Sequence, residues 1–358
     1  MGLDTVRILM TGAGAPGYPS ILNCLRNNGE RELFIVGVDM NPMATCRLKV
    51  DKFYQVPVAS DPVFIDKVLE ICKEEKIQVL ISIVTRELEL FAAAKNRFGE
   101  VGTIVSVMDY KPLHIANNKG MLLTAMKKGG LPTPDFRVVL TPEELEKAVY
   151  ELGYPRESVV IKPTFGNGSR GVRILDANKS RYDQFFKEKP NSQYMRFEEL
   201  KDIIAERNEI PEMVVMEYLP NEEISVDILA EHGETVCFSC RQGVVISSIM
   251  VSSIIKFNEE AIELAKKITK LLNLDGNIGF DMKVDKNGRP QLMEINPRLP
   301  AGVVNTVVAG VNMPYLRIKQ VLGEEILDCH VTEGYMMQFR NEEVLYNPDG
   351  SLVDWKVR

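Results

Sequence analysis

The sequence predicts an α/β protein built in two parts, and three observations support this. Residues 5 to 108 alternate between short apolar strands and helices, which is typical of a parallel sheet covered by helices. After residue 109 the pattern changes, and three strands follow one another between residues 213 and 239. With 358 residues and no internal repeat, the chain is long enough for roughly two or three domains.

The first part is expected to contain four strands and three helices. The expected strands are Thr5 to Met10, Leu33 to Asp39, Gln78 to Val84 and Gly102 to Val107. The expected helices are Pro19 to Asn28, Phe64 to Glu74 and Leu88 to Arg97. This regular alternation favours a parallel sheet with crossover helices.

A glycine-rich turn, Gly12 to Gly17, joins the first strand to the first helix. It reads G-x-G-x-x-G, and Asp39 follows about 20 residues further on. Such glycines let the backbone approach a pyrophosphate, so the turn alone resembles a dinucleotide-binding fingerprint. A nicotinamide-dependent oxidoreductase is therefore one open interpretation.

The second part is expected to mix helices and strands less regularly. The expected helices are Asn117 to Lys127, Glu143 to Leu152, Phe197 to Arg207 and Glu259 to Leu272. The expected strands are Val159 to Pro163, Met213 to Tyr218, Ile224 to Ala230 and Thr235 to Ser239. The helix after Thr141 has strong start signals, because a threonine N-cap precedes a proline and an acidic first turn.

A second glycine-rich loop follows the strand that carries Lys162. It contains Gly166, Gly168, Ser169 and Gly171. Glycines expose backbone N–H groups to an anion, and the serine adds a hydroxyl donor. The lysine precedes the glycines, so the loop is no Walker A motif. We expect a mobile phosphate-binding lid, with a plain hairpin turn as the alternative.

Residues 280 to 298 predict a β-hairpin with a polar face. Asn287-Gly288 is typical of a two-residue type I′ turn, which would place Lys286 opposite Arg289 and Asp281 opposite Glu294. Two facing carboxylates repel each other unless a cation lies between them. A slip of one residue would turn Asp281 toward Met293, and a merely solvated face is the alternative.

The same face is expected to continue through Asn296 and Arg298, since side chains repeat every second residue along a strand. Carboxylate and amide oxygens suit Mg²⁺, which proteins typically hold together with substrate phosphates. The neighbouring arginine suits a phosphate group. The hairpin therefore predicts a magnesium and phosphate site.

Composition excludes several classes of protein. The net charge is −7 and the pI is near 5.3, which gives no basic surface for nucleic acid or an anionic membrane. No apolar run of about 18 residues and no signal peptide is found. We expect a cytoplasmic enzyme with small-molecule substrates. Among six cysteines, only Cys237-x-x-Cys240 has metal or redox spacing, and structural cysteines are expected.

These segments together resemble the ATP-grasp superfamily, in particular its carbamoyl-phosphate synthetase large-subunit-like and carboxylate–amine ligase branch. The resemblance covers about residues 5 to 318. It is carried by Lys162 with the loop from Thr164 to Gly171, by Glu217-Tyr218-Leu219-Pro220 with Glu223, and by Asp281 with Glu294-Ile295-Asn296-Pro297-Arg298. Because this family places a similar domain first, the resemblance makes the nicotinamide interpretation of the first loop less favoured.

The resemblance implies a domain layout. A Rossmann-like pre-ATP-grasp domain would cover residues 1–110, and a two-lobed α+β ATP-grasp domain would cover residues 111–318. The latter would comprise a lid subdomain at about 137–212 and a C-lobe at about 213–318. Residues 319–358 would form a C-terminal extension of unassigned role.

The resemblance also implies roles for single residues. Lysines would contact the ATP phosphates, the glycine loop would close over the γ-phosphate, and the bend after residue 213 would hold adenine and ribose. The implied nucleotide-binding residues are Lys119, Lys162, Gly166, Gly168, Ser169, Gly171, Glu217, Leu219 and Glu223. Mg²⁺ or Mn²⁺ would be held by Asp281, Glu294 and Asn296, and Arg298 would steady the transferring phosphoryl group.

The implied activity is an ATP- and magnesium-dependent ligase that activates a carboxylate as an acyl phosphate for attack by an amine. Gly14 and Arg241 are candidates for the acceptor site, and an amino-acid-like substrate and a homodimer are expected. Three alternatives stay open: phosphorylation of carbamate or carbonate, a thiol acceptor, and a regulatory protein that binds ATP without turnover.

Overall fold

The computed structural model describes residues 3–166, 168, 170–188, 193–246, 249–327, 329–338, 344–351 and 353. Contacts divide the chain into two compact units. Unit 1 comprises Met1–His114, Ser225–Phe280 and Ile295–Arg358, and unit 2 comprises Ile115–Ile224 and Asp281–Glu294. These units group residues by contact in space, so the domain boundaries expected at residues 110 and 318 stay predictions.

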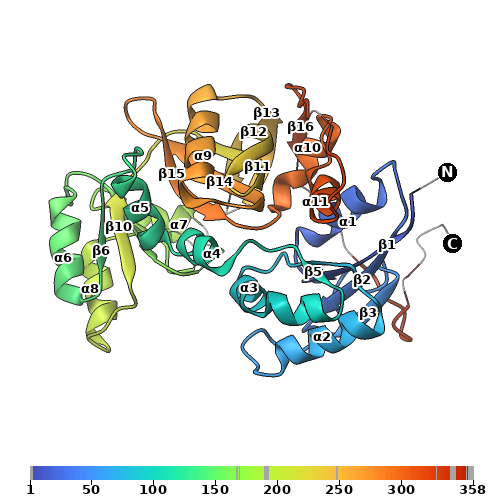
Figure 1. Cartoon of the computed structure of the whole chain (residues 1–358). Coiled ribbons are helices and arrows are strands. Elements are labelled where there is room, and N and C mark those ends of the chain that lie inside the picture. Colours follow the sequence, from blue (N-terminus) through green and yellow to red (C-terminus); the bar gives the residue numbers. More distant parts are fainter. Residues whose placement is uncertain are drawn as a thin grey trace. The chain divides into compact units, whose positions relative to one another are not determined.

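The first sheet, in unit 1, is parallel and has the order β3-β2-β1-β4-β5. Its strands are β1 (Val6–Thr11), β2 (Leu33–Asp39), β3 (Lys52–Gln55), β4 (Val79–Ile81) and β5 (Ile104–Val105). Figure 1 shows α2 (Phe64–Glu74) and α3 (Thr85–Glu100) on one side, and α1 (Tyr18–Arg26) with α11 (Met313–Val321) on the other. The predicted parallel α/β fold is confirmed.

This strand order has a functional consequence. The chain leaves β1 toward β2 on one side and later returns to β4 on its other side. The carboxyl ends of β1 and β4 therefore border a topological switch point, where doubly wound sheets bind their ligands. The first glycine loop begins at this edge, directly after Thr11.

The second sheet, in unit 2, has the order β6-β10-β7-β8-β9. Its strands are β6 (Phe136–Val139), β7 (Val159–Pro163), β8 (Arg173–Leu175), β9 (Tyr194–Met195) and β10 (Met213–Glu217). The helices of this unit include α5 (Lys119–Lys128), α6 (Pro142–Glu151), α7 (Arg181–Lys187) and α8 (Phe197–Ala205), and α4 (Tyr110–Asn117) precedes them. Thr141 caps α6 as expected, because its hydroxyl accepts the N–H of Glu144.

The third sheet has six strands in the order β15-β14-β11-β12-β13-β16. They are β11 (Glu223–Glu231), β12 (Glu234–Ile246), β13 (Ile249–Ile255), β14 (Gly276–Val284), β15 (Pro290–Asn296) and β16 (Met336–Gln338). Helix α9 (Glu259–Leu272) packs against β12, and the short helices η1 (Ala301–Val303) and α10 (Val304–Val308) follow β15. β13 and β16 were not predicted.

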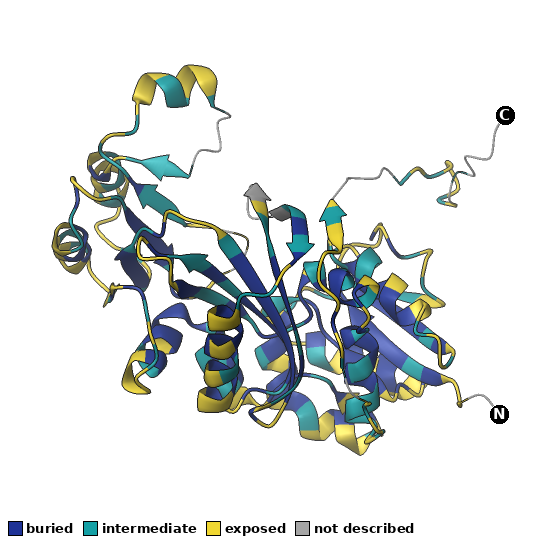
Figure 2. Ribbon diagram, turned by 90° about the horizontal axis from the view of Figure 1, so that it is seen from above, coloured by how far each residue is buried: buried dark blue, intermediate teal, exposed yellow. Residues whose placement is uncertain are grey.

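Each unit has its own hydrophobic core. In unit 1 the core joins the first sheet to strands β11 and β12 and to α11, through residues such as Ile8, Leu229, Cys237 and Ile318. In unit 2 it lies between the second sheet and helices α6 and α8. Figure 2 shows the strands mostly buried and the outer faces of the helices exposed. Within the described ranges, no helix is long and apolar enough to cross a bilayer.

The hairpin turn differs from the prediction. The Asp285 N–H donates to the Arg289 carbonyl at 2.9 Å, and the Gly288 N–H donates to the Asp285 carbonyl at 3.1 Å. Gly288 has φ +81°, whereas Asn287 does not have a positive φ. The loop therefore has three residues, as in a type I turn with a glycine bulge, and the expected type I′ turn is wrong.

This turn changes the register of the hairpin. Asp285, rather than Lys286, stands opposite Arg289. Regular pairing counted from there would bring Asp281 opposite Met293. The expected pairing of Lys286 with Arg289 is therefore wrong, while the opposition of Asp281 and Glu294 stays a prediction. Met293 and Glu294 are both partly exposed although they are consecutive in β15, so the strand does not alternate strictly there. A break in alternation at this point is what would let Asp281 and Glu294 share a face.

Candidate functional site

Two lysines of unit 2 lie against strand β15. Lys162 is buried on β7, and its Nζ donates to the Met293 carbonyl at 2.8 Å. Lys119 opens α5, and its Nζ lies 3.3 Å from Glu294 Oε2 and 2.9 Å from the Gly166 carbonyl. The predicted lysines, the glycine loop and Glu294 are thus brought together around one point.

Local structure explains the place of Lys119. Asn118 caps α5, because its Oδ1 accepts the Met121 N–H at 2.9 Å. The Lys119 N–H donates to the Thr164 carbonyl at 3.0 Å, which fixes the first turn of the helix beside the glycine loop. A Cβ at Gly120 would approach Thr164 Cγ2 to 3.1 Å, so glycine permits this close packing.

Burial changes the pKa of Lys162. Burial lowers the pKa of Lys162 to about 8, the Glu294 carboxylate opposes this shift, and the charge of Lys119 adds to it. Lys162 is therefore mostly charged at pH 7 and loses its proton in mildly alkaline solution. A buried ammonium of this kind favours an anionic ligand, because a phosphate would repay its desolvation.

The second glycine loop has a backbone that only glycine adopts readily. Gly166, Gly168 and Gly171 have φ values of +134°, +64° and +75°. A Cβ at Gly171 would lie 2.7 Å from Pro163 Cγ, so an alanine there would collide with the end of β7. Ser169, which is expected to contact phosphate, lies outside the described residues.

The strand bend after β10 is tied to its surroundings through its own polar groups. Glu217 Oε1 accepts the Asp135 N–H at 2.9 Å, and Leu219 is buried. Glu223 Oε1 lies 3.4 Å from Lys283 Nζ, which places a β14 cation beside the residue expected to hold ribose. The bend therefore shares unit 2 with the lysines, and its roles toward adenine and ribose stay predictions.

The hairpin provides donors that suit a hard divalent cation. Asp281 and Glu294 belong to unit 2, whereas Asn296 belongs to unit 1. The Glu294 side chain is 37% exposed, so one carboxylate is open to a ligand beside Lys119. Two carboxylates and an amide oxygen match the ligand preference of Mg²⁺. In the described ranges no three His, Cys, Asp or Glu side chains cluster as a metal site, so the metal-binding roles of Asp281, Glu294 and Asn296 stay predictions.

Arg298 lies at the carboxyl edge of the first sheet in unit 1. Its Nε donates to Thr85 Oγ1 at 3.1 Å, and its Nη2 donates to Asn296 Oδ1 at 3.4 Å. Thr85 opens α3, directly beyond β4. The arginine expected to steady a phosphoryl group therefore lies beside the switch point of this sheet.

Gly14 and the first loop are held by Asp39. Asp39 Oδ2 accepts the Gly14 N–H at 2.8 Å, and the Val38 carbonyl lies within hydrogen-bond distance of the N–H groups of Gly12 and Ala13. Asp39 would hold a ribose in a dinucleotide site, but here it is engaged by the loop itself. The role of Gly14 toward an acceptor substrate stays a prediction.

Sequence reasoning missed Glu87, a buried carboxyl group at the same edge. Its Oε2 accepts a hydrogen bond from Ser82 Oγ at 2.9 Å, and Ser82 Oγ lies 3.0 Å from Thr11 Oγ1. Burial raises the pKa of Glu87 to about 7, although hydrogen bonds from Thr11 and Ser82 oppose the shift. The available signal was an acidic residue just after a predicted strand, but the sequence does not show that the Glu87 side chain is buried.

Arg241 is buried on β12 in unit 1, where it forms an ion pair with Asp227 of β11. A Cβ at Gly302 would lie 3.1 Å from the Arg241 guanidinium, so Gly302 makes room for it. A Cβ at Gly17 would lie 3.0 Å from Ala301. The turn of residues 299–302 is thus in contact with both the first loop and Arg241, the two expected acceptor elements.

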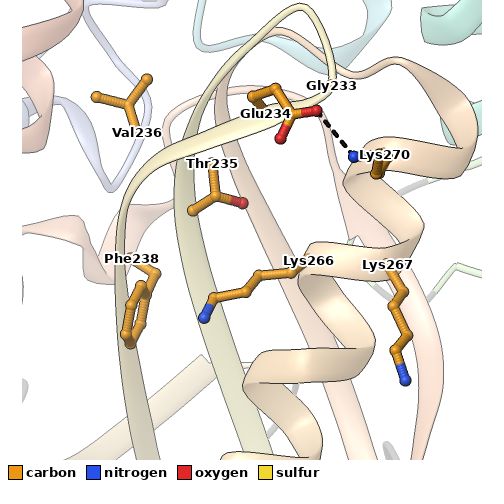
Figure 3. Close-up of a pocket in the computed structure, with 8 residues that line it drawn as sticks. All are labelled: Gly233, Glu234, Thr235, Val236, Phe238, Lys266, Lys267 and Lys270. Atoms are coloured by element: carbon orange, nitrogen blue, oxygen red, sulfur yellow. Dashed lines mark ion pairs between the residues drawn. The ribbon is translucent and has the colours of Figure 1, made fainter.

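An open pocket of about 390 Å³ lies elsewhere in unit 1, between β12 and α9. Figure 3 shows Lys266 beside Phe238, with its Nζ 4.6 Å from the ring centroid, and Lys270 paired with Glu234 at 3.1 Å. None of the predicted site residues lines it. The expected lysines, the glycine loop and Glu294 gather instead around strand β15.

Comparisons with known proteins identify two family models along the chain. Residues 8–106 match the family model described as the PylC-like N-terminal domain. Residues 209–343 match the model described as ATP-grasp in the biosynthetic pathway with Ter operon. The second of these models spans all six strands of the third sheet, and the first spans the first sheet except the start of β1.

Whole-chain relatives are distant. The formate-dependent phosphoribosylglycinamide formyltransferase of Wolinella succinogenes is 22% identical over 98% of this chain and 84% of its own length. An ADP complex of N5-carboxyaminoimidazole ribonucleotide synthetase is 20% identical with a TM-score of 0.68, over 94% of this chain and 82% of that one.

The biotin carboxylase domain dimer of Hydrogenobacter thermophilus 2-oxoglutarate carboxylase, in complex with MgADP, ADP and bicarbonate, is 17% identical with a TM-score of 0.68. That match covers 92% of this chain and 73% of that one. The similarity in fold therefore runs through both units. Residues 209–343 match an ATP-grasp family model, and a PylC-like N-terminal domain precedes them.

Proposed function

We propose that this protein is an ATP-dependent carboxylate–amine ligase that releases ADP and phosphate. One observation carries the proposal: Lys119 and Lys162 meet Glu294 and the second glycine loop around strand β15. This set combines two cations for phosphates, a carboxylate for a metal and a backbone able to close. Relatives that carry ADP or MgADP support a nucleotide here.

The proposed reaction has two steps. A carboxylate oxygen attacks the γ-phosphorus of ATP, which forms an acyl phosphate and releases ADP. The amine then attacks the acyl carbon, and the resulting tetrahedral species expels inorganic phosphate. Phosphoryl transfer needs positioning and charge neutralisation rather than a protein nucleophile, and the two lysines with Arg298 supply positive charge.

Asp281, Glu294 and Asn296 would hold Mg²⁺, or Mn²⁺ in its place. The metal would neutralise phosphate charge when bound. Glu294 would then have two roles. It would bind the metal, and it would keep the ammonium of Lys119, which lies beside it, near the phosphates. Removing its carboxylate would weaken both the binding of the metal and the placement of Lys119.

The acceptor amine is assigned to the carboxyl edge of the first sheet. Gly14, Glu87 and Arg298 lie at this edge. An attacking amine must lose a proton, and a carboxyl group whose pKa is near 7 is suited to accept one at neutral pH. Amino-acid-like acceptors fit this pairing of an acidic and a basic group. A homodimer is the proposed assembly.

The test is ADP release from Mg-ATP across pools of amino acids and small carboxylates, measured singly and in combination. The proposal expects turnover only when both a carboxylate and an amine are present, with loss of turnover in Glu294→Ala. Glu222, an exposed carboxylate on the bend, provides the matched control Glu222→Ala. Turnover that survives in Glu294→Ala would contradict the metal and phosphate assignment.

A second candidate takes bicarbonate as the carboxyl donor. The structural relative with bound bicarbonate and MgADP supports it. It would form a carboxyphosphate by the same first step, with the same lysines. ADP release stimulated by bicarbonate alone would favour this candidate, whereas dependence on an organic carboxylate would favour the first.

A further inference from the structure

Residues 345–351, which lie in the C-terminal extension of unassigned role, form a tight turn, called the C-terminal turn below. The Asn347 N–H donates to the Ser351 carbonyl at 2.8 Å, and the Gly350 N–H donates to the Asn347 carbonyl at 2.8 Å. Gly350 has φ +81°, which glycine adopts readily. The Asp349 carboxylate accepts the Ser351 N–H at 2.9 Å. The shape of the turn is therefore fixed by its own hydrogen bonds.

Arg47 fastens the C-terminal turn to the β2–β3 loop (residues 40–51). Its Nη2 donates to the Gly350 carbonyl at 2.7 Å, and its guanidinium carbon lies 4.9 Å from the centroid of the Tyr346 ring. Its Nη1 donates to the Pro42 carbonyl at 3.4 Å within the loop. A Cβ at Gly350 would lie 3.2 Å from Arg47 Nη2, so glycine lets the guanidinium approach the backbone. One arginine thus joins two segments that are 303 residues apart.

The β2–β3 loop is in turn packed onto the first glycine loop. The Cys46 N–H donates to the Ala13 carbonyl at 3.2 Å, and Cys46 is buried. Asp39 accepts the Gly14 N–H with one carboxylate oxygen and the Asn41 N–H with the other, both at 2.8 Å. Movement of the β2–β3 loop would therefore disturb the backbone of the first glycine loop.

We propose that the C-terminal turn is a strap that holds the β2–β3 loop against the first glycine loop, with Arg47 as the positioning residue. The strap would thereby keep the acceptor site in shape. This last role rests on the proposed function, whereas the strap itself does not. All of the contacts that carry it lie within unit 1. A protein without the strap would keep its nucleotide site and hold its acceptor less well.

Tyr346 offers a matched pair of variants. Its hydroxyl is buried and has no hydrogen-bond partner within the described residues, so the ring provides the contact with Arg47. Tyr346→Phe keeps the ring and should leave the strap intact, because only an unpaired hydroxyl is lost. Tyr346→Ala removes the ring, and Arg47→Ala removes the guanidinium. Lys49, which is exposed on the same loop, provides the charge-matched control Lys49→Ala.

The experiment measures amide hydrogen exchange of the folded protein by peptide mass spectrometry, without any ligand. In Arg47→Ala and Tyr346→Ala, exchange in residues 41–47 and 11–18 should be faster by about tenfold or more, because a contact to a charged group is lost. Tyr346→Phe and Lys49→Ala should match the wild type. Exchange in residues 159–171 should be the same in all five proteins.

Three results would overturn the strap. The first is unchanged exchange of residues 11–18 in both Arg47→Ala and Tyr346→Ala. The second is equally fast exchange in Tyr346→Phe, which would mean that the ring is not the contact that matters. The third is an acceleration spread evenly over unit 1, which would mean a general loss of stability.

A kinetic readout tests the positioning role separately. With a carboxylate and an amine that support ADP release, Tyr346→Ala should raise KM for the amine about fivefold and leave KM for ATP unchanged. Tyr346→Phe should retain the wild-type values. An equal rise in both KM values would contradict the positioning role. The exchange measurement needs no substrate, so it decides the strap even where the proposed ligase reaction fails.

Discussion

The two glycine-rich loops of this chain both follow a buried strand, yet their surroundings differ. In the first loop, Asp39 accepts the Gly14 N–H, so a carboxylate already occupies the place of an anion. In the second loop, the Gly166 carbonyl accepts a hydrogen bond from the Lys119 ammonium, and Lys162 lies on the preceding strand β7. The first loop thus contacts a carboxylate, whereas the second lies near two lysines.

This difference decides which loop suits a phosphate. Glycines only permit close approach of the backbone, and the neighbouring charges select the ligand. A trianionic or tetra-anionic nucleotide phosphate is favoured beside Lys119 and Lys162 and disfavoured beside Asp39. Although the first loop has the better-known sequence pattern, we expect the second loop to bind the nucleotide phosphates.

The largest expected effect comes from Glu294→Ala. Loss of this carboxylate would remove a proposed metal ligand and the partner of Lys119, so ADP release should fall by about 10²–10³-fold or more. The measurement is steady-state ADP release at saturating Mg-ATP, with Glu222→Ala as the control of equal charge change. Equal rates of ADP release in Glu294→Ala and Glu222→Ala would contradict the assignment of the phosphate site to the second loop and β15.

Lys162→Met should weaken ATP use by roughly 10–100-fold, since a charged hydrogen-bond donor to phosphate is lost. Because burial places the Lys162 pKa at about 8, kcat/KM for ATP should fall as pH rises through that value. Lys162→Arg should retain charge and shift this step beyond pH 9. A wild-type profile that is flat between about pH 7 and 9 would contradict the assignment.

The glycines offer a matched pair of substitutions. Gly171→Ala introduces a Cβ 2.7 Å from Pro163 at a φ of +75°, so KM for ATP should rise about tenfold through strain in the loop. Gly14→Ala places a Cβ 3.2 Å from Asp39 and should raise KM for the acceptor while leaving that for ATP unchanged. Steady-state kinetics with each substrate varied separates the two. An ATP effect from Gly14→Ala would reverse the roles of the loops.

The last prediction concerns stability beside the first loop rather than activity. Burial raises the folded-state pKa of Glu87 from 4.5 to about 7, so the folded protein binds the proton more tightly. The associated stability is present below about pH 4.5 and is lost as pH rises toward 7, by roughly 3 kcal/mol. Urea unfolding at pH 5 and 7.5 should show this loss in wild type and little of it in Glu87→Gln. A parallel loss in both proteins would mean that other groups titrate.

Much of the fold was predictable because it follows local pattern. β2, α2, β7 and α9 have the expected bounds, since each has a clear period and clear end signals. β3 and β16 were missed because they are short and lie at sheet edges, where pairing rather than composition makes a strand. The turn of the hairpin was misjudged because Asn-Gly also fits a three-residue loop with the glycine at positive φ.

The residue types of the candidate site were predictable from the sequence, but the positions of these residues in space were less so. Lys119 and Glu294 lie side by side as expected, and Lys162 contacts the same strand. The buried carboxyl of Glu87 was not foreseen. Its burial depends on tertiary packing, which no local pattern records.

The most direct test is hydrogen exchange of the wild-type protein with and without Mg-ADP, followed by peptide mass spectrometry. The account predicts that nucleotide alone protects the peptides containing residues 159–171 and 290–296 and leaves residues 11–18 unchanged. Protection of residues 11–18 by Mg-ADP, with none at the lysines and β15, would contradict it.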